Sequence, residues 1–269
     1  MHIDEQRLII ETENQKIKNN MLKINKRIMV FSGKGGVGKT TVSINLAYAL
    51  HCQKRKTAIL DADITGPNVP EMLALDKMLS LKNNRIIPND VNGVKIVSIA
   101  NLVDSDQPII WRGPMRSKVL HQFLADVEWG IIDFLIIDLP PGTGDEIITM
   151  VQKIQPELAI IVTTPQDVSL LDARKAINMA KKMQIPATGL IENMSGLICP
   201  DCGKRINIFG TGGGKKLAQE MNIQFLGEIP LDINLRKISD RGEVIIMKDE
   251  KSPVSLTMKK IAQKILRII

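Results

Sequence analysis

The 269-residue chain lacks the long hydrophobic runs of a membrane protein, because no segment approaches the roughly 18 uninterrupted apolar residues of a membrane-spanning helix. Its first residues, MHIDEQRLIIETENQ, are acidic and polar, whereas a signal peptide is basic and then apolar. The hydrophobic content of 44% is enough for a sizeable core, and 24% charged residues is normal for a soluble protein. We therefore expect a cytoplasmic protein.

Aromatic residues are scarce as well, and this argues against nucleic acid as a partner. One tyrosine and two tryptophans offer little surface on which bases could stack. The net charge of +7 could attract nucleic acid or an anionic membrane, but the lysines are scattered along the chain. The charge therefore indicates a basic solvated surface, and we expect no nucleic-acid partner.

Cysteine is too scarce for a disulfide framework. The chain has three cysteines, an odd number, and Cys199 and Cys202 lie three residues apart. In a cytoplasmic protein this spacing favours metal or redox chemistry. Cys52 lies in or near the end of a predicted helix, and we expect it to be a small buried residue.

Internal repeats and low-complexity tracts are also absent, and residues 26–269 read as one domain. Six short, continuously apolar segments have the pattern of strands covered on both faces. They are residues 27–32, 57–60, 94–100, 134–138, 158–164 and 188–192. Segments between them, such as TTVSINLAYALHCQ and DVSLLDARKAINMAKKM, have helical periodicity. This alternation predicts an α/β fold with a mostly parallel, doubly wound sheet flanked by helices. Residues 1–25 are expected to form a polar extension or mobile arm.

A glycine-rich stretch, GKGGVGKTT, follows the first predicted strand and precedes the first predicted helix. Residues 33–40 fit the phosphate-loop pattern G-x-x-x-x-G-K-[ST], which requires this context. Backbone N–H groups of such a loop surround phosphate oxygens at a helix N-terminus. The predicted nucleotide contacts are Gly33, Gly35, Gly36, Val37, Gly38, Lys39, Thr40 and Thr41. Lys39 would reach the β- and γ-phosphates and the Thr40 hydroxyl would bind Mg²⁺, which makes the domain a P-loop NTPase. A glycine-rich turn that binds nothing is the alternative, and Lys34 has no place in this task within one chain.

Three aspartates follow predicted strands near this loop. Asp138 ends the segment FLIID, where an acid can support Mg²⁺. Asp61 and Asp63 lie in LDADITGPNVP, and we assign Asp63 to orienting the attacking water and Asp61 to the magnesium shell. Solvated acids at strand ends are the alternative interpretation. The guanine signature N-K-x-D is absent, so the sequence favours ATP over GTP.

The sequence CPDCG holds Cys199 and Cys202. Its spacing lets both thiolates face one metal, and the following glycine allows a tight turn whose N–H groups can bond to sulfur. A thioredoxin-like redox pair fits less well, because polar loop residues surround the cysteines. Iron–sulfur clusters and structural zinc usually take four protein ligands. This chain offers two, so we expect a symmetric homodimer with the metal on its twofold axis.

Several stretches are typical of one family: SGKGGVGKTTVSINLA, DADITGPNVP, WRGPM, DLPPGTGD, ENMSG, CPDCGK, IFGTGGGKKLA and LGEIPLD, in this order between residues 32 and 232. With them the sequence resembles the Mrp/ApbC-type iron–sulfur cluster carrier ATPases, which belong to the deviant Walker A class. The resemblance implies an enzyme that hydrolyses ATP with Mg²⁺. It also implies a [4Fe–4S] cluster held between two subunits and passed to apo-proteins.

The resemblance further implies roles at matching positions. Lys34 would be the signature lysine that crosses the dimer interface to the partner's nucleotide, and Asp63 would be the hydrolytic acid. Asn193 in ENMSG would contact adenine, and the loop at Pro230 and Leu231 would close over the base.

Two other functions stay open at this point. The C-terminal segment SLTMKKIAQKILRII has Met258, Ile261, Ile265 and Ile268 on one face. Such a basic amphipathic helix can lie on anionic lipid, as in a positioning ATPase of the septum-site or chromosome-partition type. More often such a helix closes a sheet, so membrane binding is the weaker interpretation. The cysteine site could also hold zinc in a dimeric ATPase.

Overall fold

The computed structural model describes residues 2–63, 66–75, 78–102, 113–142, 144–199 and 202–269. Some residues of the quoted stretches lie outside these ranges. In the family-typical stretches they are Ile64 and Thr65 of DADITGPNVP, Trp111 and Arg112 of WRGPM, Thr143 of DLPPGTGD, and Pro200 and Asp201 of CPDCGK.

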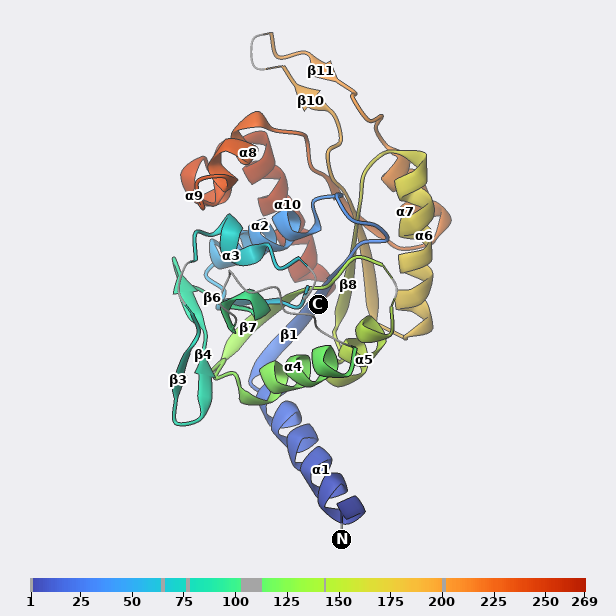
Figure 1. The fold of residues 1–269 in the computed structure, drawn as a ribbon. Helices are drawn as coiled ribbons and strands as arrows, with labels where there is room; N and C mark the ends of the chain where they lie inside the picture. The colour runs from blue at the N-terminus through green and yellow to red at the C-terminus, as the bar shows by residue number, and fades with distance from the viewer. Residues whose placement is uncertain (1, 64–65, 76–77, 103–112, 143, 200–201) are drawn as a thin grey trace.

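An eight-stranded sheet forms the centre of the molecule (Figure 1). In spatial order its strands are β12 (Gln224–Glu228), β9 (Ala187–Glu192), β8 (Leu158–Thr163), β1 (Ile24–Phe31), β7 (Ile132–Asp138), β2 (Thr57–Asp61), β6 (Val94–Ser98) and β5 (Asn89–Val91). All neighbouring pairs are parallel except β5 and β6. The mostly parallel sheet is therefore confirmed, and the six predicted strands correspond to β1, β2, β6, β7, β8 and β9.

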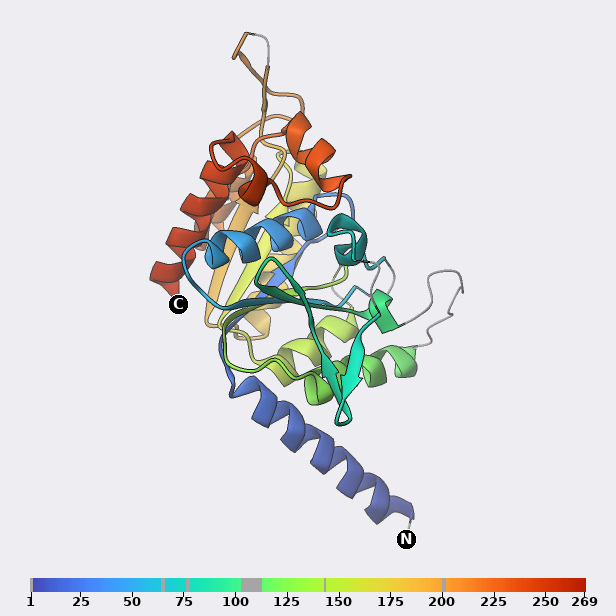
Figure 2. The same cartoon turned by 90° about the vertical axis from the view of Figure 1, so that its left-hand side faces the viewer.

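Helices cover both faces of this sheet, as Figures 1 and 2 show. The covering helices are α2 (Lys39–His51), α4 (Gly113–Asp126), α5 (Asp145–Ile154), α6 (Asp167–Lys182), α7 (Gly213–Glu220), α9 (Ile245–Lys248) and α10 (Pro253–Ile268). Met29 and Phe31 of β1 belong to the core shared with α4 to α7, whereas Ile28 and Val30 belong to the core shared with α2, α9 and α10. Alternate strand residues thus meet different helices, which is why the central strands are continuously apolar.

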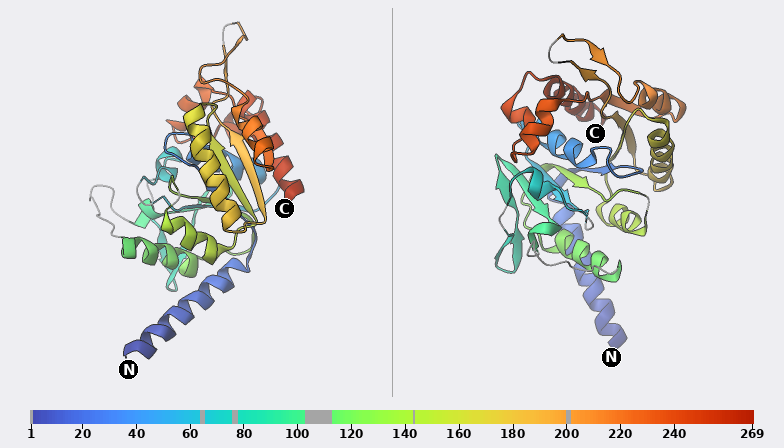
Figure 3. Two further views of the ribbon diagram at one scale, coloured as in Figure 1. Left: turned by 90° about the vertical axis from the view of Figure 1, so that its right-hand side faces the viewer. Right: turned by 45° about the horizontal axis from the view of Figure 1, so that its top comes forward.

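Shorter elements connect this framework. They are α3 (Val69–Met72), η1 (Ile99–Leu102), α8 (Ile233–Ser239), and two hairpins formed by β3 (Ser80–Lys82) with β4 (Arg85–Ile87) and by β10 (Leu197–Ile198) with β11 (Arg205–Ile206). The β10–β11 hairpin projects far from the sheet and helices (Figures 1 and 3). It carries Cys199 and Cys202 near its tip.

Residues 1–25 do not form the predicted polar arm throughout. Helix α1 (His2–Met21) fills most of this range, and β1 already begins at Ile24. The N-terminal part of α1 projects from the rest of the fold (Figure 2), but its last turns pack against α4 with Ile17 and Met21 buried. The prediction is therefore wrong for the second half of the helix, because its narrow apolar stripe is enough to join the core.

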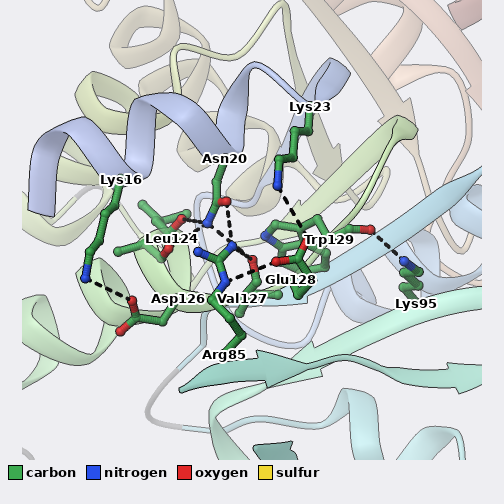
Figure 4. Close-up of polar contacts among 11 residues, drawn as sticks. Lys16, Asn20, Lys23, Arg85, Lys95, Leu124, Asp126, Val127, Glu128 and Trp129 are labelled. Atoms are coloured by element: carbon green, nitrogen blue, oxygen red, sulfur yellow. Dashed lines mark hydrogen bonds and ion pairs between the residues drawn. The ribbon is translucent and has the colours of Figure 1, made fainter. Parts of the chain in front are cut away.

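A buried amide fixes the end of α1. Asn20 Nδ2 donates to the backbone oxygens of Leu124, Ala125 and Val127, at 3.0, 2.7 and 3.2 Å (Figure 4). Arg85 of β4 in turn donates to Asn20 Oδ1 at 2.8 Å. These bonds satisfy carbonyls at the C-terminal end of α4, which otherwise have no partner within the helix.

The C-terminal helix α10 closes the sheet instead of presenting its apolar face. It packs against α2 and β12, and Met258, Ile261 and Ile265 are buried. The interpretation of α10 as a sheet-covering helix is confirmed, and these buried residues are not available to bind lipid. Among the described helices, none is long and apolar enough to cross a membrane.

Candidate nucleotide site and cysteine hairpin

The phosphate loop joins the end of β1 to the start of α2, as the sequence predicts. Gly36 and Gly38 have φ angles of 79° and 80°, which residues with a side chain rarely adopt. A Cβ atom on Gly38 would lie 2.3 Å from Asn193 Nδ2, and one on Gly33 would lie 2.3 Å from the backbone oxygen of Asp172. Backbone conformation and close neighbours therefore both require glycine in this loop.

Asp138, at the end of β7, gathers the polar side chains of the loop. Its fully buried carboxylate forms an ion pair with Lys39 Nζ at 2.9 Å. It also accepts hydrogen bonds from Thr40 Oγ1 and Ser43 Oγ, each at 2.7 Å. Two of the three residues predicted to serve Mg²⁺, Thr40 and Asp138, are thus in direct contact. Ser43 was not predicted, although its position one helical turn after Lys39 is a usable signal.

Asp61 lies beside Asp138 in the register of β2 and β7. Its fully buried carboxylate accepts hydrogen bonds from Ser98 Oγ at 2.9 Å and from the backbone N–H groups of Asp63 and Val69 at 3.2 and 3.3 Å. Burial, and then the negative charge of Asp138, raise the pKa of Asp61 to about 7. The contacts of Asp61 hold the loop of Asp63, and its role toward Mg²⁺ stays a prediction.

A cavity of about 490 Å³ lies against the phosphate loop. Its lining residues include Gly35, Gly36, Val37, Gly38, Lys39, Thr40, Thr41, Asp63, Asn68, Glu71 and Met72. Strand β2 ends at Asp61, and the loop that follows it brings Asp63 to this wall. Lys39, Thr40 and Asp63, which are predicted to bind phosphate, bind Mg²⁺ and orient the attacking water, therefore border one space. Lys34 is half-buried and is not part of this lining.

A second cavity of about 580 Å³ shares Gly38, Thr41, Glu71 and Met72 with the first. Its other walls include Asn193, Met194, Pro230, Leu231 and residues of α8. Asn193 Nδ2 donates to the Val37 backbone oxygen at 2.9 Å, so this side chain also supports the phosphate loop. The residues predicted to surround adenine thus lie together, next to the space predicted for the phosphates.

The cysteine hairpin is built by short backbone contacts. Cys199 N–H donates to the Lys204 oxygen at 3.0 Å, and Gly203 N–H donates to the Cys199 oxygen at 2.9 Å. Gly203 has a φ of 71°, as the expected tight turn after the cysteines requires. Cys199 is half-buried and Cys202 is exposed, and neither forms a disulfide. The hairpin therefore places two cysteines that are not in a disulfide near its tip.

Cys52 differs from its expected state. It follows the last residue of α2, as predicted near a helix end, but it is exposed. Its Sγ lies 3.9 Å from Met247 Sδ. Within the described part of the chain, no group of three or more His, Cys, Asp or Glu side chains could hold a metal ion.

A model of the ParA family, described as NUBPL iron-transfer P-loop NTPase, matches residues 23–266. The chain belongs to this family. The family range begins just before β1 and ends within α10, so it takes in the sheet, the phosphate loop and the cysteine hairpin.

Relatives agree over nearly the whole chain. The iron–sulfur cluster carrier protein of Methanocaldococcus jannaschii is 48% identical over 265 residues, which cover 96% of this chain and 90% of the relative. The iron–sulfur cluster transfer protein NUBPL of Dictyostelium discoideum is 42% identical over 243 residues, which cover 89% of this chain and 75% of the relative.

Solved structures support the same fold. A nucleotide-binding protein from Archaeoglobus fulgidus in complex with ADP has a TM-score of 0.78 and 38% identity, covering 90% of this chain and 95% of that one. The cell division ATPase MinD of Pyrococcus furiosus has a TM-score of 0.68 at 22% identity, covering 91% of this chain and 100% of that one. The MinD likeness shows a shared fold.

Proposed function

We propose that this chain is an ATP-binding and ATP-hydrolysing carrier that holds a [4Fe–4S] cluster between two copies of itself and transfers it to apo-proteins of the cytoplasm. The observation that carries the proposal is the C-x-x-C pair, Cys199 and Cys202, near the tip of a projecting hairpin of an iron-transfer NTPase family member. The names of its relatives support iron–sulfur clusters as the cargo.

The nucleotide side of the proposal follows from the loop geometry. Thr40 and Asp138 offer a hydroxyl and a carboxylate in contact, which is the oxygen donor set that Mg²⁺ prefers. Mg²⁺ bound there would neutralise charge on the β- and γ-phosphates. Lys39 would bind the phosphates from the first turn of α2, and Asp63 would accept a hydrogen bond from the attacking water.

The cargo side requires a second copy of the chain. Two thiolates per chain make half of the usual cluster ligand set, and a twofold axis through the hairpin tips would supply the other half. Val168 and Leu171 are 64% and 61% exposed on α6, next to Asp172, which contacts Gly33. This apolar surface beside the phosphate loop supports a partner there, where Lys34 would reach the partner's nucleotide.

Anaerobic reconstitution with iron and sulfide tests this function. The unmodified chain should bind about two iron atoms per chain, or one cluster per dimer, with the visible absorption of a [4Fe–4S] cluster. Cys199→Ala and Cys202→Ala should each lose the cluster, whereas Cys52→Ala, which removes an exposed thiol elsewhere, should keep it.

Two results would contradict the proposal. A Cys199→Ala chain that still held a full cluster would show that the hairpin is not the site. Zinc in anaerobically purified protein that iron and sulfide do not replace would favour the zinc-bridged dimer.

A further inference from the structure

The base of the cysteine hairpin is held by a network of polar side chains that no step of nucleotide hydrolysis uses. Its buried part is Glu192, the last residue of β9, which is fully buried. The Glu192 carboxylate accepts hydrogen bonds from Ser195 Oγ at 2.6 Å and from the N–H groups of Gly212 and Gly214 at 3.0 and 2.5 Å. It therefore ties the segment after β9 to the start of α7.

Arg205, on the returning strand β11, forms the outer part of this network. Its Nη2 lies 3.0 Å from the Ser195 oxygen, 3.3 Å from Glu228 Oε2 and 3.4 Å from Thr211 Oγ1. These partners belong to the segment before β10, the end of β12, and the loop before α7. One guanidinium nitrogen thus joins the hairpin to three other segments, and the group has further N–H donors on its other nitrogens.

The same segments also border the second cavity, which is lined by Asn193 and Leu231 and is assigned to adenine. Leu231 N–H donates to the Gly196 oxygen at 2.8 Å, and Leu231 pairs with Leu197 of β10 in an isolated bridge. Ser195 N–H donates to the Ile229 oxygen at 2.9 Å. Leu231 lines the cavity assigned to adenine and is also bonded to the segment that begins the hairpin.

Gly196 marks the place where these two connections meet. It has a φ of 75°, and a Cβ atom there would lie 2.6 Å from Arg205 Nε. The arginine therefore lies directly on the backbone turn that Leu231 bonds to. Since Arg205 and Glu228 are 50% and 30% exposed, their ion pair is weak and can break and re-form at small cost.

We propose that Arg205 is a positioning residue, which makes the hairpin carrying Cys199 and Cys202 respond to the nucleotide bound between Asn193 and Leu231 in the same chain. Nucleotide binding moves the Leu231 segment, Gly196 follows through its backbone bond, and Arg205 transmits the change to β11. This inference deepens the proposed function and rests on it, because it names how one site regulates the other.

Thiol labelling of the cluster-free chain tests the inference. In a Cys52→Ser background, which removes the other exposed thiol, the reaction rate of the hairpin thiols with a chromogenic disulfide reagent is measured with and without Mg-ADP. We expect Mg-ADP to change this rate by about fivefold, the lower end of coupling between two sites. Arg205→Met should abolish most of that change while the affinity for ADP stays the same, and Arg205→Lys should restore part of it.

Arg174→Met is the matched control, because Arg174 forms an ion pair of similar exposure with Glu220 on α7, away from the hairpin. It should leave the nucleotide response intact. A full response in Arg205→Met, or none in the Cys52→Ser chain, would overturn the inference. Because no cluster is used, a chain that shows the response yet fails to bind iron and sulfide would disprove the proposed function and leave this inference standing.

Discussion

At the phosphate loop, Lys39, Thr40 and Ser43 already meet Asp138 within one chain, and these groups are largely buried. At the hairpin, by contrast, Cys199 is half-buried, Cys202 is exposed, and no further metal ligands from the described residues join them. The difference separates two tasks. The polar groups of the nucleotide site are positioned in advance within one chain, whereas the proposed cluster would require further ligands from outside the chain.

Lys34→Ala tests whether the nucleotide site of one chain depends on a residue from a second chain. If Lys34 serves the partner's nucleotide, the variant still binds ATP through Lys39 but hydrolyses it about a thousandfold more slowly, as expected for a cation supplied in trans. Steady-state phosphate release and ATP affinity measure the two effects. Normal turnover in this variant would refute the role, and Lys39→Ala, which should lose ATP affinity, is the comparison variant.

Asp138→Ala tests how self-contained the nucleotide site is. Removing the carboxylate leaves Lys39, which is 7% exposed, without its ion-pair partner, and we expect a loss of about 3 kcal/mol in the free energy of unfolding. Urea unfolding measures the loss. Asp133→Ala, near the other end of β7, removes an exposed hydrogen bond to Lys56 and should cost much less. Equal losses in the two variants would contradict the assignment.

Asp61 gives the same site a pH dependence. The folded chain binds the Asp61 proton up to about pH 7, whereas an unfolded aspartate releases it near 3.8. Between these values the folded state binds more protons, so this residue stabilises the fold most at low pH and its contribution is lost as the pH rises toward 7. Asp61→Asn should flatten this part of the stability profile in urea unfolding, and an unchanged slope would refute the attribution to Asp61.

Asn20→Ala gives the smallest effect and tests a region outside both sites. Loss of three buried hydrogen bonds to the end of α4 should lower the free energy of unfolding by about 2 kcal/mol. Asn19→Ala, at an exposed position of the same helix, should change little. ATP affinity and the labelling of the hairpin thiols should be unaffected, and a change in either would mean that α1 is coupled to the sites.

The sequence predicts the parts of this fold that rest on local patterns. The six buried strands are continuously apolar, and the phosphate loop is contiguous, so both can be read from single segments. Strand β12 is missed, because QFLGE at the sheet edge is only partly buried and lacks such a run. Helix α1 is misassigned because most of its residues are polar, and its contribution to the core depends on Ile17 and Met21.

The site residues, too, divide into those that a local pattern predicts and those that depend on contacts formed by the fold. Lys39, Thr40 and Asp138 are predicted from motifs, and the structure brings them into contact. Glu192 and Arg205 are missed, since their partners come from loops that only the fold brings together. The sequence points to these contacts only through the stretches ENMSG and IFGTGGGKKLA, whose glycines and serine are not explained by any local pattern. Burial of Cys52 was wrongly expected because the solvent exposure of a helix end depends on packing.

The projecting β10–β11 hairpin has one more mechanical consequence. In the proposed response the hairpin rotates about its base at Gly196 and Arg205, and the cysteines lie near its tip. Any rotation at the base displaces the tip farther than the base itself, so in the proposed dimer shifts too small to alter the fold would bring the two thiols toward the partner copy or withdraw them from it. Lengthening the hairpin by two residues in each strand would leave the nucleotide site intact but change the spacing that the proposed shared cluster would have to span.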